Sequence, residues 1–174
     1  RAADPGHDAD GDMLVQHLPP ILPLPPRQWL GRKLARRLLD LPETAEIALL
    51  QLGAGANFDT SLVRDLALRR LLADPGRHVV EIVSPIAPRA VRSTDPRHHV
   101  RTVFPAAQYQ RAFDFAVSAA GYNSFHEIIA GALPCLFTPN DAPEMDLQEA
   151  RASYAALAGW ALAASARDPY AIER

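Results

Sequence analysis

Three short segments of the sequence carry small or polar residues at places where a strand would give way to a helix. Residues 53–57 read GAGAN, residues 118–134 read SAAGYNSFHEIIAGALP, and residues 140–148 read NDAPEMDLQ. A turn of small residues before a helix lets an anion approach N–H groups that have no partner inside the helix. The first two segments therefore suggest phosphate binding, and the third could present an acid and an amide to a ligand with many hydroxyls.

Each segment also has a purely structural interpretation. GAGAN lacks the third glycine of a dinucleotide fingerprint, because Phe58 stands there, and it lacks the Lys-Ser/Thr of a P-loop. Ser124 and Glu127 have the spacing of a capping box, in which Ser124 caps the helix and Glu127 reaches back to the backbone. Asp146 could likewise cap the helix that follows it. A capping box does not account for residues 121–123.

The elements that would position these loops alternate along the chain. Short apolar runs predict strands at 47–52, 78–84, 99–104, 113–118, 135–139 and 160–164. Helical patterns cover 27–40, 59–73, 106–111, 123–132 and 146–158. This alternation predicts an α/β fold, a Rossmann-like open parallel sheet with helices on both faces. Ligands bind at the carboxyl ends of the strands in such a sheet, which is where the three loops would lie.

Composition fits a globular domain and excludes several classes of function. The chain has 174 residues, of which 48% are hydrophobic and 22% charged. The net charge of −2 gives no case for nucleic-acid binding. Cys135, the one cysteine, cannot form an internal disulfide and is expected to be a buried small hydrophobe. The histidines have no metal-ligand spacing to an acid, so we expect no metal.

The first 26 residues differ from the rest. They are rich in Asp and Gly and then in Pro, so we expect 1–26 to be a disordered or Pro-rich interdomain linker and 27–174 to form the domain.

No apolar run reaches the roughly 20 residues of a membrane helix, which favours a cytoplasmic protein. The helix at 27–40 should bury Trp29, Leu30, Leu34 and Leu38. Its basic face would be solvated, or would contact another domain or the inner face of an anionic membrane, through Arg32, Lys33, Arg36 and Arg37.

Residues 113–160 resemble the donor-binding signature of GT-B glycosyltransferases, the nucleotide-sugar enzymes with two Rossmann-like domains. The shared features are a small-small-Gly-aromatic-Asn-Ser turn, a Glu three residues later, Ala-Gly-x-x-Pro, a strand that ends in Pro, and a loop with Asp and Gln. The segment is most similar to the bacterial N-acetylglucosaminyltransferases that make the peptidoglycan lipid intermediate, and to the UDP-glucosyltransferases and other UDP-glycosyltransferases. The likeness covers about residues 45–165.

The resemblance implies a role for each matching residue. Glu127 would accept hydrogen bonds from both ribose hydroxyls, Phe104 would lie near the base, and Asp146 and Gln148 would meet the hydroxyls of the sugar. The diphosphate would lie against two loops, made by Gly53, Ala54, Gly55 and Asn57 and by Gly121, Tyr122, Asn123 and Ser124.

Two departures from the family pattern qualify these roles. Ala119 stands where plant-type relatives have a phosphate-binding His and also where retaining enzymes have a Glu, which favours an inverting mechanism. Leu147 separates Asp146 from Gln148, which are adjacent in many relatives, so we expect only one of them to face the sugar.

The implied activity is transfer of a hexose or N-acetylhexosamine from a UDP-sugar to an acceptor, with no cofactor or metal. The general base usually lies on the N-terminal acceptor domain, which is absent here, so no catalytic base is named. The expected partners are the UDP-sugar and either that missing domain or a separate acceptor-binding chain. The start at Arg1 rather than Met favours a piece of a longer enzyme. A stand-alone donor-binding subunit and a UDP-sugar hydrolase remain open alternatives.

Overall fold

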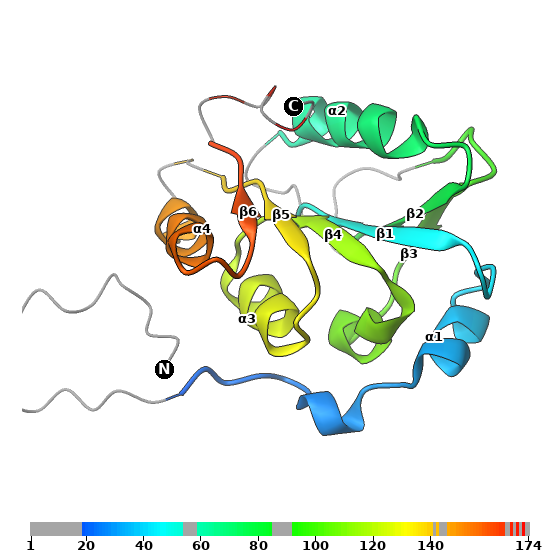
Figure 1. Ribbon diagram of the computed structural model, residues 1–174, viewed down its shortest axis with the longest axis horizontal. Coiled ribbons are helices and arrows are strands. Elements are labelled where there is room, and N and C mark those ends of the chain that lie inside the picture. Colours follow the sequence, from blue (N-terminus) through cyan, green and yellow to red (C-terminus); the bar gives the residue numbers. More distant parts are fainter. Residues whose placement is uncertain are drawn as a thin grey trace, which may run out of the picture.

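Six parallel strands form the centre of the molecule (Figure 1). The computed structural model describes residues 19–53, 59–84, 92–140, 142, 146–165, 168, 170 and 172. The strands are β1 (Glu46–Gln51), β2 (Arg77–Ile82), β3 (His98–Arg101), β4 (Phe115–Ser118), β5 (Cys135–Phe137) and β6 (Leu162–Ala163). They are arranged in the order β3-β2-β1-β4-β5-β6, and every neighbouring pair is parallel. The predicted Rossmann-like open parallel sheet is confirmed.

Helices cover both faces of this sheet. The α-helices are α1 (Arg32–Leu38), α2 (Ser61–Leu72), α3 (Tyr122–Ala130) and α4 (Gln148–Leu157), and the 3₁₀ helices are η1 (Pro26–Gln28) and η2 (Ala106–Ala112). Figure 1 shows α2 on one face and α1, α3 and α4 on the other. Each helix between two strands is the crossover that a parallel pair of strands requires.

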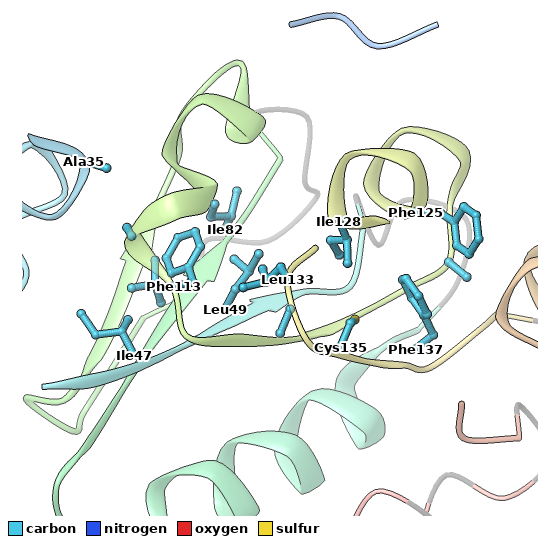
Figure 2. Packing of buried hydrophobic residues seen from close by; sticks show 14 of the residues in the cluster. Ala35, Ile47, Leu49, Ile82, Phe113, Phe125, Ile128, Leu133, Cys135 and Phe137 are labelled. Carbon is cyan, nitrogen blue, oxygen red and sulfur yellow. The ribbon is translucent and has the colours of Figure 1, made fainter. Parts of the chain in front are cut away.

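The two faces of β1 belong to two separate hydrophobic clusters. Ile47 and Leu49 point into the cluster beneath α1, α3 and α4, whereas Ala48 and Leu50 pack against α2. Figure 2 shows the first cluster, where Phe125 and Ile128 of α3 point toward the sheet; the rings of Phe125 and Phe137 are 5.2 Å apart. A strand that is buried on both faces is apolar at most positions, which explains the apolar run at 47–50 within β1.

The strand order places a topological switch point between β1 and β4. The chain passes from β1 outward to β2 and β3 and then returns to the other side of β1. The connections after β1 and β4 therefore diverge, and a crevice opens at the carboxyl ends of these two strands. Gly53 follows one of them and residues 119–121 follow the other.

The predicted helix at 27–40 is wrong in its extent, and its predicted buried face is only partly right, because Trp29 is buried but lies before α1. The chain forms η1, then an extended segment, and α1 begins only after Gly31. Leu34 and Leu38 are exposed, and Arg36 is buried with 1% of its surface accessible. The apolar periodicity failed here because Arg36 satisfies main-chain and carboxylate oxygens that would otherwise be unpaired beneath the helix.

Arg36 joins the amino ends of the two central strands. Its guanidinium donates to the carbonyl oxygens of Glu43 at 2.7 Å, Ala45 at 2.9 Å and Ala112 at 2.9 Å, and to Asp114 at 2.9 Å. Asp114 also accepts a hydrogen bond from Arg32 at 2.6 Å. Two members of the predicted basic face are therefore occupied inside the fold, and Lys33 and Arg37 remain exposed.

The predicted disorder of the N-terminal segment falls mostly outside the described residues, which begin at 19. Residues 19–25 form no helix or strand, and the indole N–H of Trp29 donates to the carbonyl oxygen of Leu24 at 2.9 Å. Among the helices that the structure describes, none is long and apolar enough to cross a membrane.

Candidate functional site at the carboxyl ends of β1, β4 and β5

The first predicted phosphate loop is described only at its first residue. Gly53 has φ of +85°, a left-handed conformation that strains any residue with a side chain, so the turn after β1 requires glycine. Ala54, Gly55 and Asn57 lie outside the described residues. The predicted helix at 59–73 begins at Ser61, and the backbone N–H of Ser61 donates to Asp59 Oδ1 at 2.9 Å.

The capping box predicted for Ser124 and Glu127 is wrong. Helix α3 begins at Tyr122, and its N-cap is Gly121, which has an extended backbone with φ of −61° and ψ of 150°. Ser124 is therefore the third residue of the helix, and no side chain caps the N-terminus. The N-cap therefore lies three residues earlier than the capping pattern suggests, at Gly121 instead of Ser124.

The N-terminus of α3 presents three backbone N–H groups that the helix itself cannot satisfy. The first intrahelical bond is donated by Phe125 to the carbonyl oxygen of Gly121 at 2.9 Å. The N–H groups of Tyr122, Asn123 and Ser124 precede that bond, and they point out of the helix end. They make a suitable binding site for an anion, because the helix dipole is positive there.

Glu127 lies one turn further along α3 and is buried, with 8% of its surface accessible. Burial raises the pKa of Glu127 above its usual value of 4.5. Among the described residues, no side chain or backbone N–H donates to its carboxylate. Among the described residues, no side-chain oxygen that is sealed from solvent lacks a hydrogen-bond partner, so the carboxylate of Glu127 reaches the surface and can accept hydrogen bonds from water or from a ligand.

The loop before α4 meets the N-terminus of α3. Gln148, the first residue of α4, is buried, and its Oε1 accepts a hydrogen bond from the backbone N–H of Asn140 at 3.1 Å. Its Nε2 faces Gly121, since a β-carbon built on Gly121 would lie 3.9 Å from that nitrogen. Asp146 is exposed just before the helix. The structure thus brings two of the three predicted segments together.

One residue of this region was missed by the reasoning from sequence. Arg151 of α4 is buried and donates from Nε to the carbonyl oxygen of Ala120 at 2.8 Å, and its Nη2 forms an ion pair with Asp146. The buried positions of α4 are Gln148, Arg151, Ala152 and Ala155, which have helical spacing. Two polar residues at the start of such a buried stripe are the signal that could have found it.

Phe104 lies at the same edge of the sheet but not in this group. It follows β3, which is three positions from β4 in the strand order, and 85% of its surface is accessible. An aromatic ring this exposed buries little apolar surface, so it contributes little to the core. Its predicted place near a nucleotide base stays a prediction.

A cavity of about 700 Å³ lies away from this edge. It opens on the α2 side of the sheet, nearer the amino ends of β4 and β5, over Phe115, Val117 and Leu136. Its walls are mainly apolar, and neither Glu127 nor Asp146 lines it. Over the part of the chain that the structure describes, no three His, Cys, Asp or Glu residues gather as a metal ion would require.

Comparison with solved structures identifies the fold. The spinosyn rhamnosyltransferase SpnG complexed with thymidine diphosphate matches 69% of this chain with a TM-score of 0.58 and 17% identity. The calicheamicin glycosyltransferase CalG4 matches 86% of it with a TM-score of 0.58 and 17% identity. The glycosyltransferase VinC in complex with dTDP matches 89% of it with a TM-score of 0.56 and 17% identity. These matches show that the chain has the fold of a GT-B glycosyltransferase domain.

The extent of these matches limits what they show. This chain spans about a third of the length of those enzymes, with 32% of SpnG, 35% of CalG4 and 35% of VinC covered. No protein-family model matches the sequence, and no curated protein matches it either. The similarity therefore concerns one domain's fold and not the particular peptidoglycan enzymes that the sequence resembles.

Proposed function

We propose that this chain is the donor-binding domain of an inverting glycosyltransferase that uses a UDP-sugar and transfers a hexose or N-acetylhexosamine. The observation that carries the proposal is Glu127, a buried carboxylate one turn from a helix N-terminus, with no donor among the described residues. A nucleoside diphosphate would supply what each group lacks. Its phosphates would accept hydrogen bonds from the N–H groups of α3, and its ribose hydroxyls would donate to Glu127.

The chemistry proposed for this domain is stabilisation of the leaving group. As the acceptor hydroxyl attacks the anomeric carbon, negative charge grows on the departing diphosphate. The fixed N–H dipoles at the start of α3 would stabilise that charge without reorganising. The general base and the acceptor site would belong to a second domain or a partner chain, which agrees with the share of the solved enzymes that this chain spans.

A thymidine diphosphate sugar is the second candidate donor. The observation in its favour is that the SpnG structure contains thymidine diphosphate and the VinC structure contains dTDP. The two candidates differ at Glu127, because deoxyribose lacks the 2′-hydroxyl and can donate only one hydrogen bond to the carboxylate. A carboxylate that binds both hydroxyls favours UDP, and one that binds a single hydroxyl does not discriminate.

The test is a calorimetric titration of the chain with UDP, dTDP and UDP-N-acetylglucosamine, repeated with Glu127→Ala. We expect UDP to bind, and the substitution to weaken it by about 1–3 kcal/mol, as for lost hydrogen bonds to a charged group. We expect dTDP to bind the native chain more weakly than UDP does. We expect the two nucleotides to bind Glu127→Ala with equal affinity. Glu149→Ala is the matched control, because Glu149 is an exposed acid in the first turn of α4.

Each outcome has a definite meaning. The proposal fails if neither nucleotide binds, or if Glu127→Ala and Glu149→Ala bind UDP alike. Tighter binding of dTDP than of UDP, weakened by Glu127→Ala, would favour the thymidine nucleotide candidate. Thermal unfolding of all three proteins checks that the variants are folded.

A further inference from the structure

We propose that Arg151 is a positioning residue of the donor site, which fixes Asp146 against the start of α3 so that Asp146, and not Gln148, meets the sugar. This inference rests on the proposed function, because the sugar is the ligand that Asp146 would meet. It goes beyond that function by assigning a role to a residue of α4 that touches neither nucleotide nor sugar.

The geometry of the guanidinium carries the proposal. Arg151 has 2% of its surface accessible, and it extends from α4 toward both loops at the carboxyl edge. Its Nε donates to the carbonyl oxygen of Ala120 at 2.8 Å, and its Nη2 pairs with Asp146 Oδ2. Ala120 is fully buried and immediately precedes Gly121, the N-cap of α3. One rigid planar group therefore joins the loop after β4 to the loop before α4.

The contacts of Gln148 leave Asp146 as the residue that faces outward. The Oε1 of Gln148 is already hydrogen-bonded to Asn140, and the side chain is buried. Asp146 has 44% of its side chain accessible and uses Oδ2 for Arg151, while no described residue donates to its Oδ1. An acceptor oxygen that is exposed and held in place is suited to a sugar hydroxyl.

The physical role proposed for Arg151 is to restrict the side chain of Asp146 to one rotamer before a ligand binds. An exposed Asp at the start of a helix samples several rotamers, and fixing one of them on binding costs free energy. The buried guanidinium selects one orientation in advance, because Ala120 holds its other edge. The effect should appear in the affinity for a nucleotide that carries a sugar, and much less in the affinity for the nucleoside diphosphate alone.

The experiment compares the dissociation constants of UDP and UDP-N-acetylglucosamine for the native chain, Arg151→Met, Asp146→Asn and the double variant. We expect each single change to weaken UDP-N-acetylglucosamine by about tenfold relative to UDP, the size of one charged hydrogen bond. We expect the double variant to shift that ratio no further than either single change. Arg151→Lys keeps the charge but cannot reach both partners, so its ratio should lie between those of the native chain and Arg151→Met.

The outcomes separate this role from a merely structural one. Arg151 does not act through Asp146 if Arg151→Met weakens the binding of UDP and UDP-N-acetylglucosamine equally. The same conclusion follows if the two single changes have additive effects on the ratio of the two dissociation constants in the double variant. Should Arg151→Met fail to fold, Asp146→Asn and Arg151→Lys decide, because an unchanged ratio in both overturns the proposal. If the native chain binds UDP, but binds UDP-N-acetylglucosamine no more tightly than UDP, this inference alone is overturned. If the native chain binds neither nucleotide, the proposed function is overturned as well.

Discussion

Two buried glutamates lie near the carboxyl edge of the sheet, and they differ in whether other side chains donate hydrogen bonds to them. Glu81 of β2 and Glu127 of α3 are about equally buried, with 7% and 8% of their surface accessible. Glu81 receives two hydrogen bonds from Arg64 of α2, at 2.6 and 2.7 Å, and its Oε2 is 2.9 Å from His98 Nε2. Glu127 receives none from the described residues. Burial alone therefore does not mark a functional carboxylate.

The two pKa values shift in opposite directions for this reason. Burial would raise both of them, but hydrogen bonds from His98 and Arg64 outweigh it at Glu81 and lower the pKa there. Burial acts unopposed at Glu127 and raises the pKa. The first arrangement stabilises the fold by holding α2 against β2 and β3. The second costs stability in the free protein, because burial penalises the charge of Glu127 and no described residue offsets that penalty.

The largest expected effect is the loss of stability in Glu81→Gln. The substitution leaves Arg64 without its buried counter-ion and replaces one acceptor oxygen with an amide NH2 that cannot accept, so we expect the free energy of unfolding to fall by about 3 kcal/mol. Urea unfolding followed by circular dichroism measures it. Glu46→Gln is the control, because Glu46 pairs with Arg77 at 2.6 Å but its side chain is 47% accessible, so we expect about 0–1 kcal/mol. Equal losses in the two variants would contradict the structural role of Glu81.

The sequence predicted one member of this comparison and not the other. Glu127 was found because it lies three residues after Ser124 in a recognisable turn, although the capping interpretation of that pair was wrong. Glu81 lies in the apolar run HVVEIVS, which indicates a buried strand and nothing more. Its partner Arg64 is 17 residues away on a helix, and no local pattern relates the two.

Buried arginines explain most of the other differences between expectation and structure. The alternation of strands and helices, the parallel sheet and the burial of Cys135 follow from local patterns of apolar residues, and all three were predicted. Arg36 and Arg151 were not predicted to be buried, since arginine is rarely found inside a protein unless its partners are fixed by the fold. Those partners are mainly carbonyl oxygens, such as those of Ala112 and Ala120, which carry no signal in the sequence.

A smaller effect of opposite sign is expected for Glu127→Gln. The amide has nearly the same shape as the carboxylate and carries no charge to desolvate, so we expect the free energy of unfolding at pH 8 to stay the same or to rise. The same variant should bind UDP more weakly than the native chain does. Urea unfolding and calorimetry on one preparation measure both. A loss of stability as large as that of Glu81→Gln would mean that Glu127 serves the fold.

The smallest effect is a difference in the pH dependence of stability. The pKa of Glu81 is lowered on folding, so the unfolded chain binds more protons below pH 4.5 and the stability from Glu81 is lost as the pH falls through its folded pKa. The pKa of Glu127 is raised, so the folded chain binds more protons above pH 4.5, and the free energy of unfolding falls as the pH rises toward the folded pKa.

Chemical unfolding of three proteins between pH 3 and pH 8 separates these two contributions. Glu81→Gln should lose less stability than the native chain when the pH falls below 4.5. Glu127→Gln should lack the decline that the native chain shows above 4.5. Saturating UDP should also remove that decline from the native chain, because ribose hydroxyls that donate to Glu127 favour its ionised form and lower its pKa again. A decline that persists with UDP bound would place the ribose elsewhere.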